Sequence, residues 1–105
     1  EQETYDIKQR IRKHIEENYA DPQLSLISVA DSFGISEVYL SRLFKQSFEQ
    51  NFSKYVEELR MNKAKELIEM DMYTVSDISG IVGYNSPQTF RRAYKRYFGC
   101  TPRER

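Results

Sequence analysis

Two stretches of the sequence carry polar side chains with the same spacing and the same chemistry. The first contains Arg42 and Lys45, and the second contains Arg92 and Lys95. An arginine can donate two hydrogen bonds to a guanine edge, and a lysine can contact a phosphate. If each stretch is a helix, its turn of about 100° per residue places these cations opposite the apolar side chains. Each stretch could therefore read bases from one exposed helix face.

The outward face of each predicted helix supplies candidates for two kinds of contact with DNA. Glutamine can pair with adenine through two hydrogen bonds, and an apolar side chain such as Val38 can pack against a thymine methyl group. We expect Arg42, Gln88 and Arg92 to be the leading base readers. Backbone amides at a helix start favour phosphate, and cations nearby add charge. The candidate phosphate contacts are Ser36, Tyr39, Lys45, Ser86, Lys95 and Arg96.

The two stretches belong to a longer internal repeat. At an offset of 49 residues, Ser25, Val29 and Gly34 fall on Thr74, Ile78 and Gly83. One residue is inserted in the second turn, and at an offset of 50 Leu40, Arg42, Phe44, Lys45 and Phe48 fall on Phe90, Arg92, Tyr94, Lys95 and Phe98. Two helices joined by a short turn form a helix-turn-helix unit, whose second helix can enter the major groove of DNA. The sequence predicts two such units.

Periodicity and capping residues predict an all-α fold of about seven helices. An opening helix carries an apolar stripe, stops near Asp21 and Pro22, and is followed by a short helix from Leu26 to Phe33. Recognition helices are expected at about 36–48 and 87–98, and one more turn begins at Thr101. We expect the following residues of the recognition helices to point inward: Leu40, Leu43, Phe44, Phe48, Phe90, Ala93, Tyr94, Tyr97 and Phe98.

A stiff helix is predicted between the two units. Helical spacing continues for roughly 17 to 19 residues without an interior glycine or proline. A length of about 25 Å, with the breadth of the flanking units, could place the recognition helices about one DNA turn, ~34 Å, apart. We therefore expect a single bipartite domain over 1–105, with units at 1–50 and 73–105 and a linker helix at 51–72.

Charge and composition restrict the classes of function. The formal net charge is zero, which taken alone argues against nucleic acid. However, residues 86–105 hold six basic residues against one acidic residue, so the remaining chain carries the opposite excess. With one cysteine and no apolar run of membrane-spanning length, we expect a cytoplasmic setting. Because the chain begins without methionine and ends abruptly at Arg105, we expect a fragment of a larger protein.

Other classes of function have weaker support in the sequence. His14 has no second ligand at metal-binding spacing, and Cys100 has no histidine nearby in sequence, so we expect no metal, no cofactor and no enzyme activity. The main alternative is a helical protein-protein interaction module, for which a neutral charge is natural. Such a module should expose clustered apolar residues, whereas the predicted outward faces are mostly polar.

Several segments resemble the C-terminal DNA-binding domain of AraC/XylS transcription regulators. The resemblance covers nearly the whole chain and is strongest at residues 39–45, 60–64, 81–84, 90–95 and 97–102. It implies two helix-turn-helix units on a linker helix, bacterial transcription regulation, and effector sensing or dimerisation by a missing N-terminal domain, with RNA polymerase as a further partner. It also implies base contacts from Val38, Ser41, Arg42, Gln88, Arg91 and Arg92.

Overall fold

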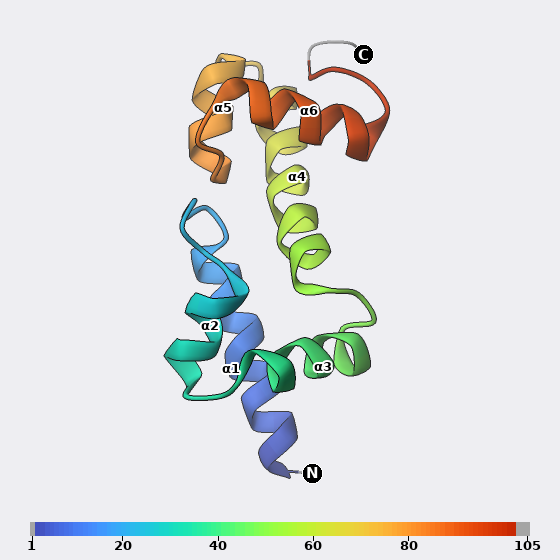
Figure 1. The fold of residues 1–105 in the computed structure, drawn as a ribbon. Helices are drawn as coiled ribbons and strands as arrows, with labels where there is room; N and C mark the ends of the chain where they lie inside the picture. The colour runs from blue at the N-terminus through green and yellow to red at the C-terminus, as the bar shows by residue number, and fades with distance from the viewer. Residues whose placement is uncertain (1, 103–105) are drawn as a thin grey trace.

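The computed structural model describes residues 2–102, and this part of the chain contains six α-helices (Figure 1). They are α1 (Gln2–Asn18), α2 (Leu26–Phe33), α3 (Glu37–Ser47), α4 (Phe52–Met70), α5 (Val75–Val82) and α6 (Pro87–Phe98). The predicted all-α fold is confirmed. The sequence also predicted one more helical turn from Thr101. Thr101 and Pro102 are not helical, and the rest of that predicted turn lies outside the described residues.

Short polar side chains set the starts of the two short helices. The hydroxyl of Ser25 accepts a hydrogen bond from the backbone N–H of Ser28, and the Ser28 hydroxyl accepts one from the N–H of Ser25. Thr74 and Asp77 form the same reciprocal pair before α5. These pairs satisfy amides that have no partner inside the helix. Helix α2 therefore begins at Leu26, where the sequence predicted.

The first helix ends earlier than expected. The sequence placed its end near Asp21 and Pro22, but α1 ends at Asn18. The Asn18 side-chain amide donates a 2.7 Å hydrogen bond to the His14 carbonyl, and the Asp21 N–H donates one of 3.0 Å to the Asn18 carbonyl. These bonds replace the next helical turn, so Tyr19 to Asp21 form a loop after α1.

Two hydrophobic cores share the long helix α4. The first core contains Ile11, Ile15, Val29, Ala30, Leu40, Leu43, Phe44 and Val56. The second core contains Met61, Ala64, Leu67, Ile68, Ile78, Val82, Phe90, Ala93 and Tyr94. On α4, Val56 therefore packs in the first core, and the buried residues from Met61 onward pack in the second core. Each recognition helix is held by its own core, and α4 is the covalent connection between them.

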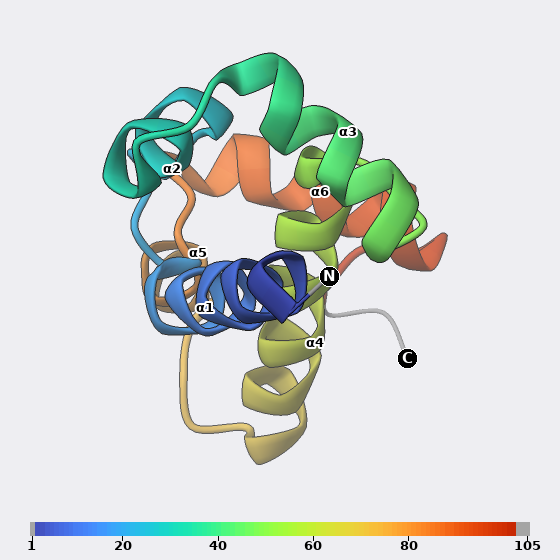
Figure 2. The same cartoon turned by 90° about the horizontal axis from the view of Figure 1, so that it is seen from below.

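The two recognition helices lie on the same side of an elongated molecule. The principal extents of the fold are 45 × 22 × 21 Å. In Figure 1, α3 and α6 run in the same direction beside opposite ends of α4. Seen along the long axis in Figure 2, both lie toward one side, while α1 and α4 lie toward the other. The fold thus presents two similarly oriented helices on one surface.

The expectation that Tyr97 points inward is wrong. Its side chain is 40% exposed, and its ring packs edge-on against Phe98 at a centroid distance of 4.8 Å. The buried stripe of α6 comprises Phe90, Ala93 and Tyr94, while Tyr97 lies a turn beyond, next to Glu57 and Glu58 of α4. Helical spacing alone did not reveal that Tyr97 lies outside the second core, against which the next residue, Phe98, packs.

Candidate nucleic-acid interface

Helix α3 exposes the residues that the sequence placed on its outward face. Its start is fixed by Ser36, whose hydroxyl accepts a 3.1 Å hydrogen bond from the N–H of Tyr39. Burial of Leu40, Leu43 and Phe44 then fixes its rotation about its own axis. The outward positions hold Val38, Ser41, Arg42 and Lys45, of which Ser41 is half-buried and the others are exposed. Tyr39 lies beside this face and is also exposed.

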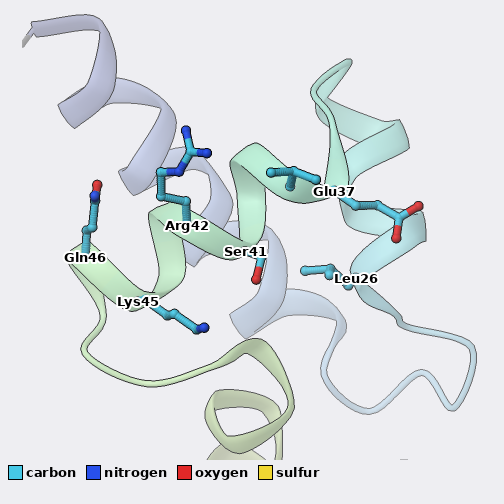
Figure 3. A pocket seen from close by; sticks show the side chains of 7 residues that line it. Leu26, Glu37, Ser41, Arg42, Lys45 and Gln46 are labelled. Carbon is cyan, nitrogen blue, oxygen red and sulfur yellow. The ribbon is translucent and has the colours of Figure 1, made fainter.

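A shallow hollow of about 570 Å³ lies along the exposed face of α3 (Figure 3). It is lined by Leu26, Glu37, Val38, Ser41, Arg42, Lys45 and Gln46. Figure 3 shows Arg42 and Gln46 along one edge of the helix and Ser41 and Lys45 along the other. This surface has donors on both edges and an apolar group at its N-terminal end, which suits the mixed edge of a base pair.

Two polar residues of this hollow, Glu37 and Gln46, were not predicted from the sequence. Glu37 could accept a hydrogen bond from a cytosine amino group, and Gln46 could pair with adenine. Spacing was the available signal, because Glu37 lies four residues before Ser41 and Gln46 lies four residues after Arg42. Residues four apart share a helix face, so both belong to the predicted outward stripe.

Helix α6 presents the more strongly basic of the two faces. Its start is fixed by Ser86, whose hydroxyl accepts a 3.2 Å hydrogen bond from the N–H of Thr89, and Pro87 occupies the first turn. With the buried stripe turned toward the second core, the exposed positions hold Gln88, Arg91, Arg92 and Lys95. This face combines three cations with one amide, and every side chain on it can donate a hydrogen bond.

Arg96 is also exposed on α6, but the structure gives it a protein partner. Its guanidinium donates a hydrogen bond to the carboxylate of Glu57 on α4. The arginine side chain is 67% exposed and the glutamate side chain 20%. This pairing partly neutralises the cation, so a phosphate contact by Arg96 would compete with Glu57. The predicted phosphate contact therefore remains a prediction.

A second, polar hollow lies between α6 and the first half of α4. Its volume is about 530 Å³, and its lining includes Lys54, Glu57, Glu58, Arg96 and Tyr97. Burial raises the pKa of the Tyr97 phenol, and the carboxylates of Glu58 and Glu57 raise it further. Tyr97 is therefore a neutral hydrogen-bond donor near neutral pH. The carboxylates make this region between the recognition helices less attractive to phosphate than either helix face.

Comparison with known proteins identifies the family. A model described as "Helix-turn-helix domain" matches residues 29–105. The solved structure of a Chromobacterium violaceum transcriptional regulator, of the AraC-type DNA-binding domain-containing proteins, is 33% identical with a TM-score of 0.75, over 89% of this chain and 82% of that chain. The chain belongs to the AraC-type helix-turn-helix family. The predicted resemblance is thereby confirmed, and this AraC-type domain contains both helix-turn-helix units.

Two further proteins show how far the likeness extends. The AraC-type domain is 34% identical over 90 residues to the uncharacterized HTH-type transcriptional regulator YpdC of Escherichia coli K12, which covers 86% of this chain and 31% of YpdC. It shares the fold of the DNA-binding domain of AdpA, solved in complex with a target DNA, at a TM-score of 0.81 and 22% identity over 89% of this chain and 83% of that chain. The chain thus spans about a third of the length of YpdC.

The described residues contain neither clustered metal ligands nor a membrane-spanning helix. Across residues 2–102, no group of three or more His, Cys, Asp or Glu side chains is arranged to hold a metal ion. Of the six described helices, none combines the length and the apolar character needed to cross a membrane.

Proposed function

We propose that this domain binds double-stranded DNA sequence-specifically, with α3 and α6 inserted into successive major grooves on one face of the duplex, and thereby regulates transcription. The observation that carries the proposal is the pair of similarly directed helices on one side of the molecule, each exposing an arginine and a lysine at matched positions (Figures 1 and 2). Helices of this kind dock into the major groove in helix-turn-helix proteins. The DNA-binding domain of AdpA, which shares the fold, was solved in complex with a target DNA, and this supports DNA as the ligand of the fold.

The base-reading role falls on the exposed middle of each helix. Arg42 and Arg92 would each donate two hydrogen bonds to guanine, and Gln88 would pair with adenine. Val38, Ser41 and Arg91 are exposed or half-buried on the same faces and would complete the readout through methyl, hydroxyl and guanidinium contacts. The second helix should contribute more to specificity, because its face has more donors suited to bases.

The phosphate-positioning role falls on the helix starts and on the cations beside the reading faces. The hydroxyls of Ser36 and Ser86 already cap their helices, so phosphates would be met mainly by the neighbouring backbone amides. Lys45 and Lys95 are exposed at matched positions and can reach the flanking backbone. Such contacts set the register of the protein on DNA without reading sequence.

The linker helix accounts for binding to two grooves by one chain. Its 19 residues correspond to about 28 Å of helix, to which the breadth of the flanking units is added. Successive major grooves on one face lie about 34 Å apart. Straight DNA would have to bend modestly to meet both helices. The energetic cost of this bend depends on the DNA sequence. Within this arrangement, 1–50 and 73–105 would be the two reading units and 51–72 the spacer.

The proposal extends to the longer protein to which such a domain would belong. Since YpdC is about three times the length matched here, a further domain for sensing or dimerisation is proposed on the N-terminal side. RNA polymerase is a proposed partner at promoters, and the cytoplasm is the proposed location. The role is binding without catalysis, because the candidate site offers donors for DNA and no convergent set of acid, base and nucleophile.

Selection from a pool of random duplexes tests the proposal. The wild-type domain, Arg42→Ala and Arg92→Ala are each selected at two salt concentrations, and the enriched sequences are compared. Two short boxes about one helical turn of DNA apart should be enriched. Each arginine variant should lose about 1–3 kcal/mol of discrimination between bases in one of the two boxes. Lys63→Ala is the matched control, because Lys63 is a half-buried cation on α4 that pairs with Glu66.

The alternative, a protein-interaction module, predicts a different outcome of the same selection. In that case no sequence would be enriched, binding would not depend on salt, and the three variants would behave alike. The exposed faces argue against this reading, because Val38 is the single apolar residue among the eight outward positions of α3 and α6. A dry protein interface depends on apolar and aromatic contacts at its centre.

A further inference from the structure

The two helix-turn-helix units touch each other directly through their backbones. A Cβ atom placed on Gly83, in the turn before α6, would lie 2.9 Å from the carbonyl oxygen of Tyr19 and 3.0 Å from that of Ala20. Gly83 also has a φ of +108°, which side-chain-bearing residues rarely adopt. The loop after α1 therefore rests against the turn of the second unit with no room for a side chain between them.

Arg60 lies at this contact and reaches into the first unit. Its Nε donates a 2.7 Å hydrogen bond to the carbonyl oxygen of Tyr19, and its Nη2 donates one of 3.1 Å to that of Asp21. Both carbonyls lie beyond the end of α1, and that of Asp21 also accepts a 3.1 Å hydrogen bond from the N–H of Leu24. The side chain comes from the part of α4 where the first core gives way to the second.

Arg60 also reaches into the second unit. Its guanidinium carbon lies 5.3 Å from the centroid of the Tyr84 ring, within the range of a cation–π interaction. The Tyr84 ring in turn lies 5.7 Å from the ring of Phe90, which is fully buried and anchors α6. Contacts thus run from the loop before α2, through Arg60 and Tyr84, to the core side of α6. We call Tyr19 to Asp21, Arg60, Gly83 and Tyr84 the joint.

We propose that Arg60 is a positioning residue that fixes the separation and relative orientation of α3 and α6, and so sets the spacing between the two DNA boxes that the domain accepts. This inference rests on the proposed two-groove binding. Without the joint, the two units would be connected by the single helix α4, whose ends can bend and fray. With it, a second connection joins them close to the middle of that helix.

The thermodynamic consequence is specific to two-box DNA. When one helix is bound, the second meets its own box at an effective concentration that depends on how rigidly the units are held. A rigid joint raises that concentration at one spacing and lowers it at others. Loss of the joint should therefore weaken binding at the preferred spacing and reduce the discrimination between spacings, while binding to one box changes little.

The first experiment compares spacings. Duplexes carrying the selected boxes at the preferred spacing, at one to three added base pairs, and at five added base pairs are titrated with the wild type, Arg60→Ala and Lys63→Ala. We expect Arg60→Ala to lose about tenfold in affinity at the preferred spacing and most of its discrimination against the others, with wild-type affinity for a single box. Lys63→Ala, on the same helix, should keep the wild-type profile. An unchanged spacing profile in Arg60→Ala overturns the inference.

The second experiment needs no DNA and separates this inference from the proposed function. Spin labels are attached to Gln46→Cys on α3 and Gln88→Cys on α6, in a Cys100→Ser background, and the distribution of distances between them is measured. Arg60→Ala should broaden a narrow wild-type distribution. Should Arg60→Ala fail to fold, Arg60→Lys keeps the cation without the two-pronged donor and should give an intermediate width. An equally narrow distribution in the folded variant overturns the inference, even if the selection shows two boxes.

Discussion

The Nε atom of Arg60 donates a 2.7 Å hydrogen bond to the carbonyl oxygen of Tyr19, 41 residues earlier in the chain. The bond connects the long helix to the loop that leads into the first helix-turn-helix unit. It is charge-assisted and partly shielded from water, so it should contribute more than an ordinary surface hydrogen bond. We propose that the joint, which includes this bond, fixes the position of the two helix-turn-helix units relative to each other.

Gly83→Ala should destabilise the fold strongly. Alanine in the left-handed region costs about 1–2 kcal/mol, and the contact of its Cβ with two carbonyl oxygens adds about 1–3 kcal/mol. Gly34→Ala is the matched control, because Gly34 ends the equivalent helix with a φ of +65° but faces open space. Gly34→Ala should lower the free energy of unfolding only by the cost of the left-handed conformation, about 1–2 kcal/mol. Urea unfolding measures the free energy of unfolding of both variants. Equal losses of this free energy would show that a Cβ atom at Gly83 meets no steric strain from the backbone contact.

Ser36→Asp should separate helix capping from phosphate contact. Aspartate caps a helix as well as serine does, so folding stability should be retained, whereas Ser36→Ala should cost about 1 kcal/mol. A carboxylate at the start of α3 would repel a phosphate and weaken DNA binding by about 1 kcal/mol. Thermal unfolding and DNA titration are measured on both variants. DNA affinity unchanged by the aspartate would mean that no phosphate lies at this helix start.

The salt dependence of DNA binding should distinguish Lys95 from Arg96. Lys95→Ala should reduce the slope of log affinity against log salt concentration by about 1, as expected for one lost phosphate contact. Arg96→Ala should reduce it less, because Glu57 already holds that guanidinium. Glu57→Gln should make the slope steeper by releasing Arg96. If Arg96→Ala and Lys95→Ala have equal effects, Arg96 leaves Glu57 when DNA binds.

Tyr84→Phe should reduce the sensitivity of folding to alkaline pH. Burial raises the pKa of the Tyr84 phenol above its ordinary value of 10.0, against a lowering effect of Arg60. The folded state therefore favours the neutral phenol, and this contribution is complete below pH 10 and is lost as pH rises through the folded pKa. The free energy of unfolding, measured in urea at pH 8 and above pH 10, should fall less in the variant. An equal fall in both proteins would exclude Tyr84 as a cause.

Much of the fold was accessible from the sequence because its determinants are local. Ser25, Thr74 and Ser86 each cap the start of a helix, and Gly83 ends α5 in the left-handed region. The rotation of each recognition helix followed from its apolar spacing, so the exposure of its outward residues was predictable. Their roles on DNA remain predictions.

The contacts between the two units were not accessible in this way. The partners of Arg60 lie 39 and 41 residues away, and Glu57 lies 39 residues from Arg96. No local rule relates such positions, since their meeting depends on the angle at which α4 joins two separate cores. The error at Tyr97 has the same origin, because tertiary packing places Tyr97 beside Glu57 and Glu58 of α4 while Phe98 packs against the second core. The repeat predicted the two units and did not predict how they meet.

On the side of the first unit, the joint is made entirely of backbone atoms: the carbonyl groups of Tyr19, Ala20 and Asp21. Any amino acid supplies those groups, so the two hydrogen bonds from Arg60 do not themselves require a particular side chain in this loop. The joint instead requires particular residue types at Arg60 and Gly83. Neither residue belongs to the faces of α3 and α6 proposed to contact bases. A protein engineer could therefore graft a new reading face onto either helix and expect both halves to stay in register.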